Sequence, residues 1–215
     1  KGSFLREGYD DLYKSIYKHF NQLLEFSNSA FKKKDSFSKK YIEYFDINLD
    51  LCKLALQHSL EIDVESLSKS LCHGDYVNKN IIFSNEDLWI IDFDKCKNDF
   101  CAHDLSYFMR RLLKRENTNW DTDLTLIILT NYNYHKKLTK SDLKYIIAYL
   151  AFPQKFWKVS HDYYKNSKIY SKTYFSKILL KANTDIDKHL NFIIELSKRL
   201  DSINWDLDLL KNKTL

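Results

Sequence analysis

The scarcity of glycine and proline is the feature that most constrains this chain. Its 215 residues include three glycines (Gly2, Gly8 and Gly74) and one proline, Pro153. Tight hairpins and bulges need glycine at positive φ, so most all-β folds are excluded, together with collagen-like and linker sequences. A glycine-rich phosphate-binding loop of the GxGxxG or GxxxxGK[ST] kind is excluded as well. We therefore expect a mainly α-helical protein.

Composition and charge narrow the function classes. Hydrophobic residues make up 44% of the chain and charged residues 29%, which is typical of a globular protein. The net charge of +5 is spread along the sequence and comes with no nucleic-acid recognition motif, so solvated helix faces are the favoured interpretation. A helical nucleic-acid-binding module remains an alternative that needs a basic patch on one face. No apolar run reaches the roughly 18 residues of a membrane helix. We expect neither nucleic acid nor membrane as a partner.

The start of the chain and its cysteines indicate a cytoplasmic fragment. Lys1-Gly2-Ser3 includes no initiator methionine and no secretory signal follows, so we expect part of a longer protein. Cys72, Cys96, Cys101 and one further cysteine are too few for a disulfide framework and are expected to be reduced. A zinc site in which Cys72, Cys96 and Cys101 are joined by His73 and His103 is a weaker alternative, because the CxxC spacing of structural zinc sites is missing.

Apolar residues recur at helical spacing over most of the sequence. Thr139 and Asp142 form a capping-box pattern, and Pro153 separates two helices. Helices are predicted over residues 8–33, 36–60, 103–115, 121–133, 141–152, 154–166, 172–182, 185–200 and 203–211, with a short helical turn over 66–70.

One segment departs from the helical pattern. Ile81–Phe83 and Leu88–Ile91 are β-rich runs on either side of the turn-forming Ser84–Asp87, which predicts a small β-hairpin. If Phe83 pairs with Trp89, Asn80 and Asp92 flank the hairpin, and the alternation of side chains along the strands places them on the same face. The fold class is therefore mainly α with a small β-hairpin.

Three polar residues flank this hairpin. In the register just given, Asn80 faces Asp92 with Cβ atoms about 5 Å apart. A carboxylate and an amide oxygen at that distance suit Mg²⁺, which prefers oxygen ligands and keeps positions for substrate phosphates. Asp75 leaves the turn opened by Gly74 and is expected to point into the same place.

The pattern H-G-D-x4-N…I-D-F-D…D-L, from His73 to Leu105, resembles the catalytic segment of the aminoglycoside-phosphotransferase and choline-kinase family. These are small-molecule kinases with a protein-kinase-like fold. The stretch 104–115, with the long helical pair before the motif, is most similar to the CotS-type spore coat branch. The resemblance implies the C-terminal helical lobe of that fold as one domain, with the N-terminal lobe absent. Its parts are a helical segment at 1–70, the catalytic loop and metal-binding hairpin at 71–102, and a helical subdomain at 103–215.

The resemblance also implies roles for single residues. Asp75 is expected to be the catalytic base, and Asn80 and Asp92 are expected to hold Mg²⁺ against the phosphates of ATP. His73 is expected to bond the backbone near Asp92. Asp104 is expected to tie down the catalytic loop, with the N-cap of helix 103–115 as its alternative.

Other residues of the segment depart from the family or leave their role open. Lys79 stands where relatives often have glycine and either stiffens the loop or meets a phosphate. Asp94 gives D-F-D in place of D-F-G and is a candidate for a second metal contact. Arg110 and Arg111 either lie beside the site or are solvated. Tight ATP binding is expected to need the missing lobe.

The acceptor is not identified by the sequence. Acidic residues in the helical lobe of this family suit cationic acceptors, and aromatic residues suit sugar rings or quaternary amines. Two functions follow: an ATP- and Mg²⁺-dependent phosphotransferase of small-molecule hydroxyl groups, or a catalytically weak or inactive structural protein of the spore coat. The expected location is the cytoplasm or the spore coat, with coat proteins as partners. The acceptor-side candidates are Tyr41, Tyr44, Trp120, Trp157, His161, Asp162, Tyr163 and Tyr164.

Overall fold

The computed structural model describes residues 6–85, 87–166 and 171–202 and is mainly helical, as predicted. Helices occur where the apolar spacing predicts them, apart from the one expected near 203–211, which lies outside the described residues. The helices are α1 (Leu12–Lys33), α2 (Ser36–Glu43), α3 (Phe45–Leu60), α4 (Cys101–Leu113), α5 (Thr122–His135), α6 (Lys140–Ala151), α7 (Gln154–Asn166), α8 (Lys172–Ala182) and α9 (Ile186–Ser202).

The single helix predicted over 36–60 is wrong, because the chain breaks at Tyr44. This residue has φ −99° and ψ 2°, outside the helical range, and the Asn48 side chain donates a hydrogen bond to its carbonyl at 2.8 Å. The apolar spacing continues through the break, so periodicity alone does not reveal it. On α2, before the break, Phe37 stacks on Tyr163 and Tyr41 stacks on Phe156, both in α7.

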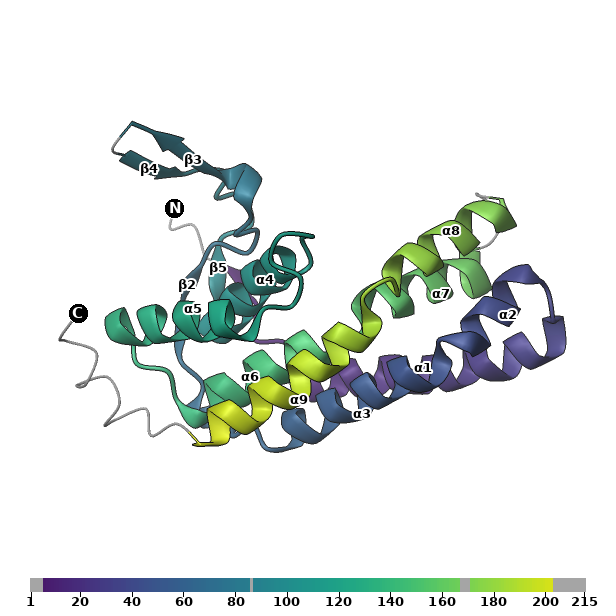
Figure 1. The fold of residues 1–215 in the computed structure, drawn as a ribbon. Helices are drawn as coiled ribbons and strands as arrows, with labels where there is room; N and C mark the ends of the chain where they lie inside the picture. Colours follow the sequence, from purple (N-terminus) through teal and green to yellow (C-terminus); the bar gives the residue numbers. More distant parts are fainter. Residues whose placement is uncertain (1–5, 86, 167–170, 203–215) are drawn as a thin grey trace.

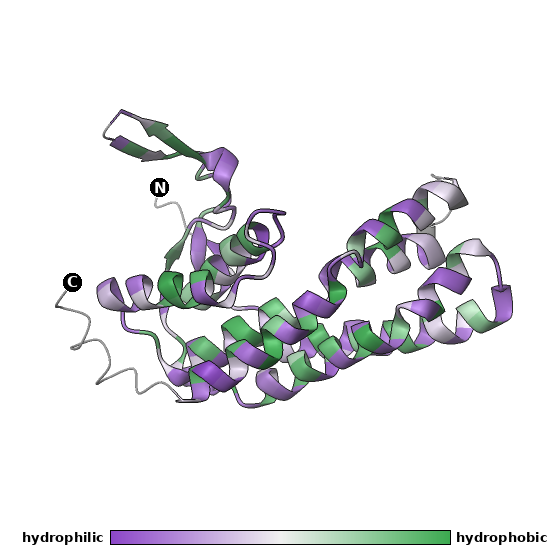
Figure 2. Cartoon of the chain, viewed as in Figure 1, coloured by the Kyte–Doolittle hydropathy of each residue, from purple (hydrophilic) through white to green (hydrophobic). Residues whose placement is uncertain are grey.

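Helix α6 lies at the centre of the molecule. It packs against α3, α4 and α9, and most of its residues are buried (Figures 1 and 2). A helix that is apolar on nearly all sides is stable only when neighbours surround it. The predicted capping box at Thr139 and Asp142 is confirmed, and Asp142 also accepts hydrogen bonds from Ser68. The chain leading into the site is thereby fixed to the central helix.

A small sheet that the sequence did not predict carries the segment around residue 73. It has the order β1 (Arg6–Glu7), β5 (Lys97–Phe100), β2 (Lys69–Cys72), with β1 and β5 parallel and β2 and β5 antiparallel. The turn predicted over 66–70 is instead a 3₁₀ helix, Val64–Ser66, followed by β2. The strands are short and largely polar, so neither β propensity nor alternation reveals them.

The predicted hairpin is present as β3 (Ile81–Ser84) and β4 (Asp87–Ile90), but its predicted register is wrong by one residue. Phe83 pairs with Leu88 and Ile82 pairs with Trp89, because Ser84 pairs with Asp87 and leaves a two-residue connection. Asn85 in that connection has φ +48°, which asparagine tolerates and which two-residue hairpins need. The hairpin extends away from the helices (Figure 1).

Buried apolar side chains from before and after the hairpin form one cluster that draws on each of the helices α1 to α9. Within the described ranges, no helix combines the length and apolar character needed to cross a membrane.

Candidate active site

In the loop after β2, one position has a backbone conformation and surroundings that only glycine can accommodate. Gly74 has φ +74°, and a Cβ atom there would lie 2.4 Å from the carbonyl oxygen of Lys95. Next to it, the His73 ring joins two segments: Nδ1 accepts from the backbone N–H of Asp75 at 3.3 Å, and Nε2 lies 3.0 Å from the carbonyl oxygen of Ile91. Since Nε2 faces a carbonyl, it carries the ring proton. The loop is thus attached to the strand that precedes Asp92.

Asp104 fixes the same loop from α4. Its Oδ2 accepts from the backbone N–H of His73 at 2.7 Å, and its Oδ1 accepts from that of Gly74 at 3.1 Å. The N-cap alternative for Asp104 is wrong, because α4 begins at Cys101 with Phe100 as its N-cap. Two backbone donors on one carboxylate hold the turn before Asp75 in a single conformation.

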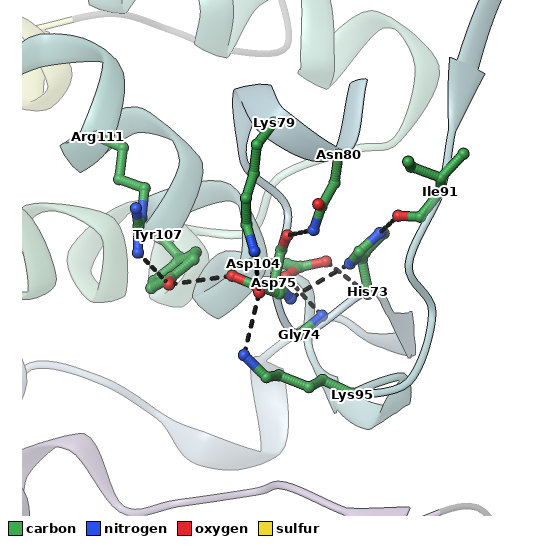
Figure 3. A network of polar contacts seen from close by, with 10 residues as sticks. All are labelled: His73, Gly74, Asp75, Lys79, Asn80, Ile91, Lys95, Asp104, Tyr107 and Arg111. Carbon is green, nitrogen blue, oxygen red and sulfur yellow. Dashed lines mark hydrogen bonds and ion pairs between the residues drawn. The ribbon is translucent and has the colours of Figure 1, made fainter. Parts of the chain in front are cut away.

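Asp75 lies at the centre of a polar network (Figure 3). Its Oδ2 is 3.0 Å from Lys95 Nζ and 3.5 Å from Lys79 Nζ, and the two lysines approach from opposite sides. Its Oδ1 accepts a hydrogen bond from the Tyr107 hydroxyl at 3.3 Å. The Asp75 side chain is 7% exposed, whereas the lysines that cover it are 65% and 64% exposed. An incoming ligand therefore reaches the carboxylate by displacing exposed amines.

The electrostatics keep Asp75 ionised. The hydrogen bond from Lys95 lowers the pKa of the Asp75 carboxyl most, burial opposes it, and the charges of Lys95 and Lys79 lower it further. In turn, Asp75 raises the pKa of Lys95, with Asp92 contributing in the same direction. The Lys95 ammonium group is thus close enough to Asp75 and to Asp92 for both carboxylates to raise its pKa.

Asn80 is buried directly behind the carboxylate. Its Nδ2 donates to the backbone carbonyl of Asp75 at 2.9 Å, so its Oδ1 is turned away from that carbonyl. The carbonyl of Asn80 also accepts from the backbone N–H of Ile91 at 3.0 Å. Asn80 therefore lies opposite Ile91, and the predicted direct pairing with Asp92 is wrong because of the register shift.

Asp92 follows Ile91, is exposed and has φ +68°. Asp94 is exposed as well. Among the described residues, no group of three or more His, Cys, Asp or Glu could hold a metal ion, and the four cysteines, including Cys72 and Cys101, are free thiols. The zinc alternative is therefore not supported. The Asn80 amide oxygen and the exposed Asp92 carboxylate are donors of the kind that Mg²⁺ takes, with phosphates supplying the remaining oxygens.

Two residues of the network were missed from the sequence. Lys95 comes from the segment after the hairpin, and Tyr107 lies one turn after Asp104 on α4. Arg111 donates to the Tyr107 hydroxyl at 2.7 Å, so it lies beside the site. Helical spacing from Asp104 is the signal that identifies Tyr107; nothing in the sequence identifies Lys95.

Other candidates have structural partners. Arg110 is 6% exposed, donates to Gln154 at 2.9 Å and lies 3.9 Å from the Tyr149 ring centroid. Neither of its contacts is a carboxylate. Of the aromatic acceptor candidates, Tyr41, Trp120 and Tyr163 are core residues.

Comparison with known proteins shows what this chain is similar to. Residues 30–132 match the phosphotransferase enzyme family. Spore coat protein S of Bacillus subtilis (strain 168) is 23% identical over 176 residues, covering 77% of this chain and 50% of that protein. The chain therefore spans about half the length of this curated relative.

Solved structures show the fold. An aminoglycoside phosphotransferase from Alicyclobacillus acidocaldarius subsp. acidocaldarius DSM 446 superposes with a TM-score of 0.78 at 20% identity, covering 90% of this chain and 60% of that one. A choline kinase from Cryptosporidium parvum Iowa II reaches a TM-score of 0.34 at 13% identity, covering 97% and 61%. The first match confirms the predicted fold class, the helical lobe of a protein-kinase-like fold.

Proposed function

We propose that this chain carries the catalytic loop of an ATP- and Mg²⁺-dependent phosphotransferase acting on a hydroxyl group of a small molecule. The observation that carries the proposal is the Asp75 carboxylate: ionised, backed by Asn80, and held on a loop that His73, Gly74 and Asp104 fix. The family match over 30–132 includes all of these residues.

In the proposed reaction, the bond between the terminal phosphorus of ATP and its bridging oxygen breaks, the phosphoryl group passes to the acceptor oxygen, ADP leaves, and the acceptor O–H gives its proton to an Asp75 oxygen. Asp75 aims the hydroxyl and takes up the proton as the new P–O bond forms. Lys95 and Lys79, which contact the carboxylate at 3.0 and 3.5 Å, would pair with phosphate oxygens instead when the nucleotide is bound. Tyr107 keeps its hydrogen bond to the other oxygen and so orients the carboxylate.

Magnesium would be held by Asn80 through Oδ1 and by the carboxylate of Asp92. When bound, the ion offsets the charge of the phosphates. Asp94 is proposed as a further metal contact, and contacts to the adenine are proposed to come from a lobe outside this chain.

The test is transfer of labelled phosphate from ATP, with Mg²⁺, to a panel of hydroxyl compounds. Asp75→Asn should reduce transfer by about 10² to 10⁴-fold, because the amide neither takes the proton nor carries charge. Asp87→Asn, the same change at an exposed hairpin position, is the matched control and should leave transfer unchanged. Equal activity of wild type and Asp75→Asn would remove the proposal.

The second candidate is a structural protein of the spore coat in which catalysis is weak or lost. The similarity to Spore coat protein S and the two lysines paired with Asp75 favour it. This second function requires that the purified protein transfer no phosphate from ATP in the presence of Mg²⁺. It also requires that the protein assemble with coat proteins whether or not Asp75 is replaced. In either case the proposed location is the cytoplasm or the coat.

A further inference from the structure

A cavity of about 740 Å³ lies between β2, α4 and α5, and Cys72 and Cys101 are among the residues that line it. Most of its other lining side chains are apolar. Leu71, Phe93 and Ile127 also line it and are exposed, so the cavity is open to solvent. A small reagent can therefore reach both thiols, although each cysteine is itself buried.

The two thiols come together where β2 meets the start of α4. Cys72 ends β2, and its Sγ lies 3.7 Å from the carbonyl oxygen of Phe100, the residue directly before Cys101. Cys101 begins α4, and its backbone N–H donates to the carbonyl of Ser68, next to the start of β2, at 2.9 Å. The two side chains are in hydrogen-bonding contact. Both cysteines therefore lie at one joint between two elements, and a disulfide requires such proximity.

The surroundings of Cys101 favour its thiolate. Besides Cys72, the side chains of Tyr132 and Lys136 hydrogen-bond to its sulfur, so three donors converge on one atom. Cys101 is also the first residue of a 13-residue helix, where a negative charge is favoured. The hydrogen bond from Cys72 lowers the pKa of the Cys101 thiol most, and Lys136 lowers it further, to about 6, whereas burial and the charge of Asp142 oppose the shift.

The surroundings of Cys72 keep this thiol protonated. Its Sγ faces the carbonyl oxygens of Asp99 and Phe100 at 3.6 and 3.7 Å, and a carbonyl oxygen can only accept a hydrogen bond. The hydrogen bond with Cys101 raises the pKa of the Cys72 thiol most, and burial and the charges of Asp104 and Asp99 raise it further. A thiolate beside a neutral thiol is the arrangement of a reactive cysteine with a resolving partner.

We propose that this pair is an oxidation site at which hydrogen peroxide converts Cys72 and Cys101 into a disulfide. The Cys101 thiolate attacks one oxygen of the peroxide, the O–O bond breaks and hydroxide leaves, so that the sulfur becomes a sulfenic acid. The Cys72 sulfur then attacks the Cys101 sulfur, the S–O bond breaks, and the departing hydroxide takes the Cys72 proton and leaves as water. In all, two electrons pass from the two sulfur atoms to the peroxide.

The disulfide would join the two segments that hold the turn before Asp75. Cys72 is adjacent to His73, and Cys101 lies one helical turn before Asp104, whose carboxylate accepts from the backbone of that turn. The link would close a loop that contains the whole hairpin. The inference goes beyond the proposed function and does not depend on it, because oxidation of the thiols involves neither ATP nor an acceptor.

Wild-type protein with its native cysteines tests the inference directly. Reduced protein treated at neutral pH with a small excess of hydrogen peroxide should lose the mass of two hydrogen atoms, and a reducing agent should restore it. Trypsin leaves the four cysteines in different peptides, and the disulfide should join residues 70–79 to residues 98–110. An unchanged mass, or a link that involves Cys52 or Cys96, would overturn the inference.

Single serine variants separate the two roles. Cys72→Ser should leave a sulfenic acid on Cys101 that dimedone traps, whereas Cys101→Ser should leave Cys72 unoxidised. Cys52→Ser is the matched control at another buried cysteine, whose pKa is raised by burial to about 12, and it should form the disulfide as wild type does. Trapping on Cys72 instead of Cys101 would overturn the assignment. Thermal unfolding midpoints establish that the variants are folded, and the wild-type measurement needs no variant.

Alkylation by iodoacetamide tests the thiolate. The labelling rate of Cys101 should reach half of its maximum near pH 6. Lys136→Gln should move that midpoint to higher pH, because the positive charge beside the sulfur is lost. Lys140→Gln, the same change at an exposed position of α6, should leave it unchanged. A wild-type midpoint at the ordinary thiol value of 9.0 would show that Cys101 is not the reactive group.

Discussion

At the scale of single residues, the turn before Asp75 depends on Gly74. We expect Gly74→Ala to lower the free energy of unfolding by about 1–3 kcal/mol, because alanine is strained at φ +74° and its Cβ meets the carbonyl of Lys95. Gly8→Ala is the control: the atoms that its Cβ meets belong to the flexible side chain of Lys97, which can move away. Urea unfolding of both variants is the measurement, and equal losses would contradict the argument.

The charge of Asp75 leads to a second residue-scale prediction. Since the Lys95 hydrogen bond is the largest cause of the lowered pKa, Lys95→Met should raise the pKa of Asp75 more than Lys79→Met does. The Asp75 ion pairs stabilise the fold above the unfolded value of 3.8, and this stabilisation is lost as the pH falls through the lower folded pKa. Carbon-detected NMR titration of the Asp75 carboxyl in both variants checks the order. The opposite order would show that Lys79 is the principal partner.

The sequence identified His73, Asp75, Asn80 and Asp104 because their spacing forms one motif. It did not identify Lys95, since an exposed lysine in a loop is common and its contact with Asp75 depends on the path of the chain after the hairpin. Residues brought together by a motif are predictable; residues brought together by loop geometry are not.

At the scale of elements, the hairpin exposes apolar side chains on both faces. Phe83 is 79% exposed and Trp89 is 58% exposed. Replacing either with threonine should change the free energy of unfolding by less than about 0.5 kcal/mol, because little apolar contact is lost. Leu51→Ala in α3, whose side chain is fully buried, should cost about 2–5 kcal/mol. Chemical unfolding compares them, and a cost at Trp89 close to that at Leu51 would mean that the hairpin is covered in solution.

Helices with a strong apolar periodicity were predictable from the sequence, whereas helix breaks and the strand register were not. The ends of α7 and α8 agree with the apolar spacing, but the break at Tyr44 depends on packing of Phe37 and Tyr41 against α7. The hairpin was predicted from β-rich runs, and its register was not, because that depends on the conformation of Asn85. The strands of the β1-β5-β2 sheet are too short and polar to be recognised from sequence.

At the scale of the whole molecule, packing around α6 makes stability depend on pH through buried histidines. His189 lies at the junction of α9 with α6, where its Nε2 donates to the carbonyl of Leu150 at 2.9 Å and its ring stacks on Trp120. Burial lowers its pKa from 6.5 to about 3, and Lys114 and Arg110 oppose its protonation further. His19, with a pKa lowered to about 4, and His58 shift in the same direction.

Below about pH 6.5 these histidines therefore bind protons in the unfolded chain and remain neutral in the folded chain. The contribution of these histidines to stability is constant well above pH 6.5 and falls as the pH drops from about 7 toward 3, by about 2 kcal/mol for His189 alone between pH 7 and pH 5. His189→Gln, which keeps a donor for Leu150, should flatten this dependence and leave the part due to His19 and His58. His135→Gln, at an exposed position of α5, is the control. Urea midpoints measured from pH 7.5 to pH 5 decide the matter, and an equally steep loss in His189→Gln would show that His189 is not the group that makes the fold sensitive to acid.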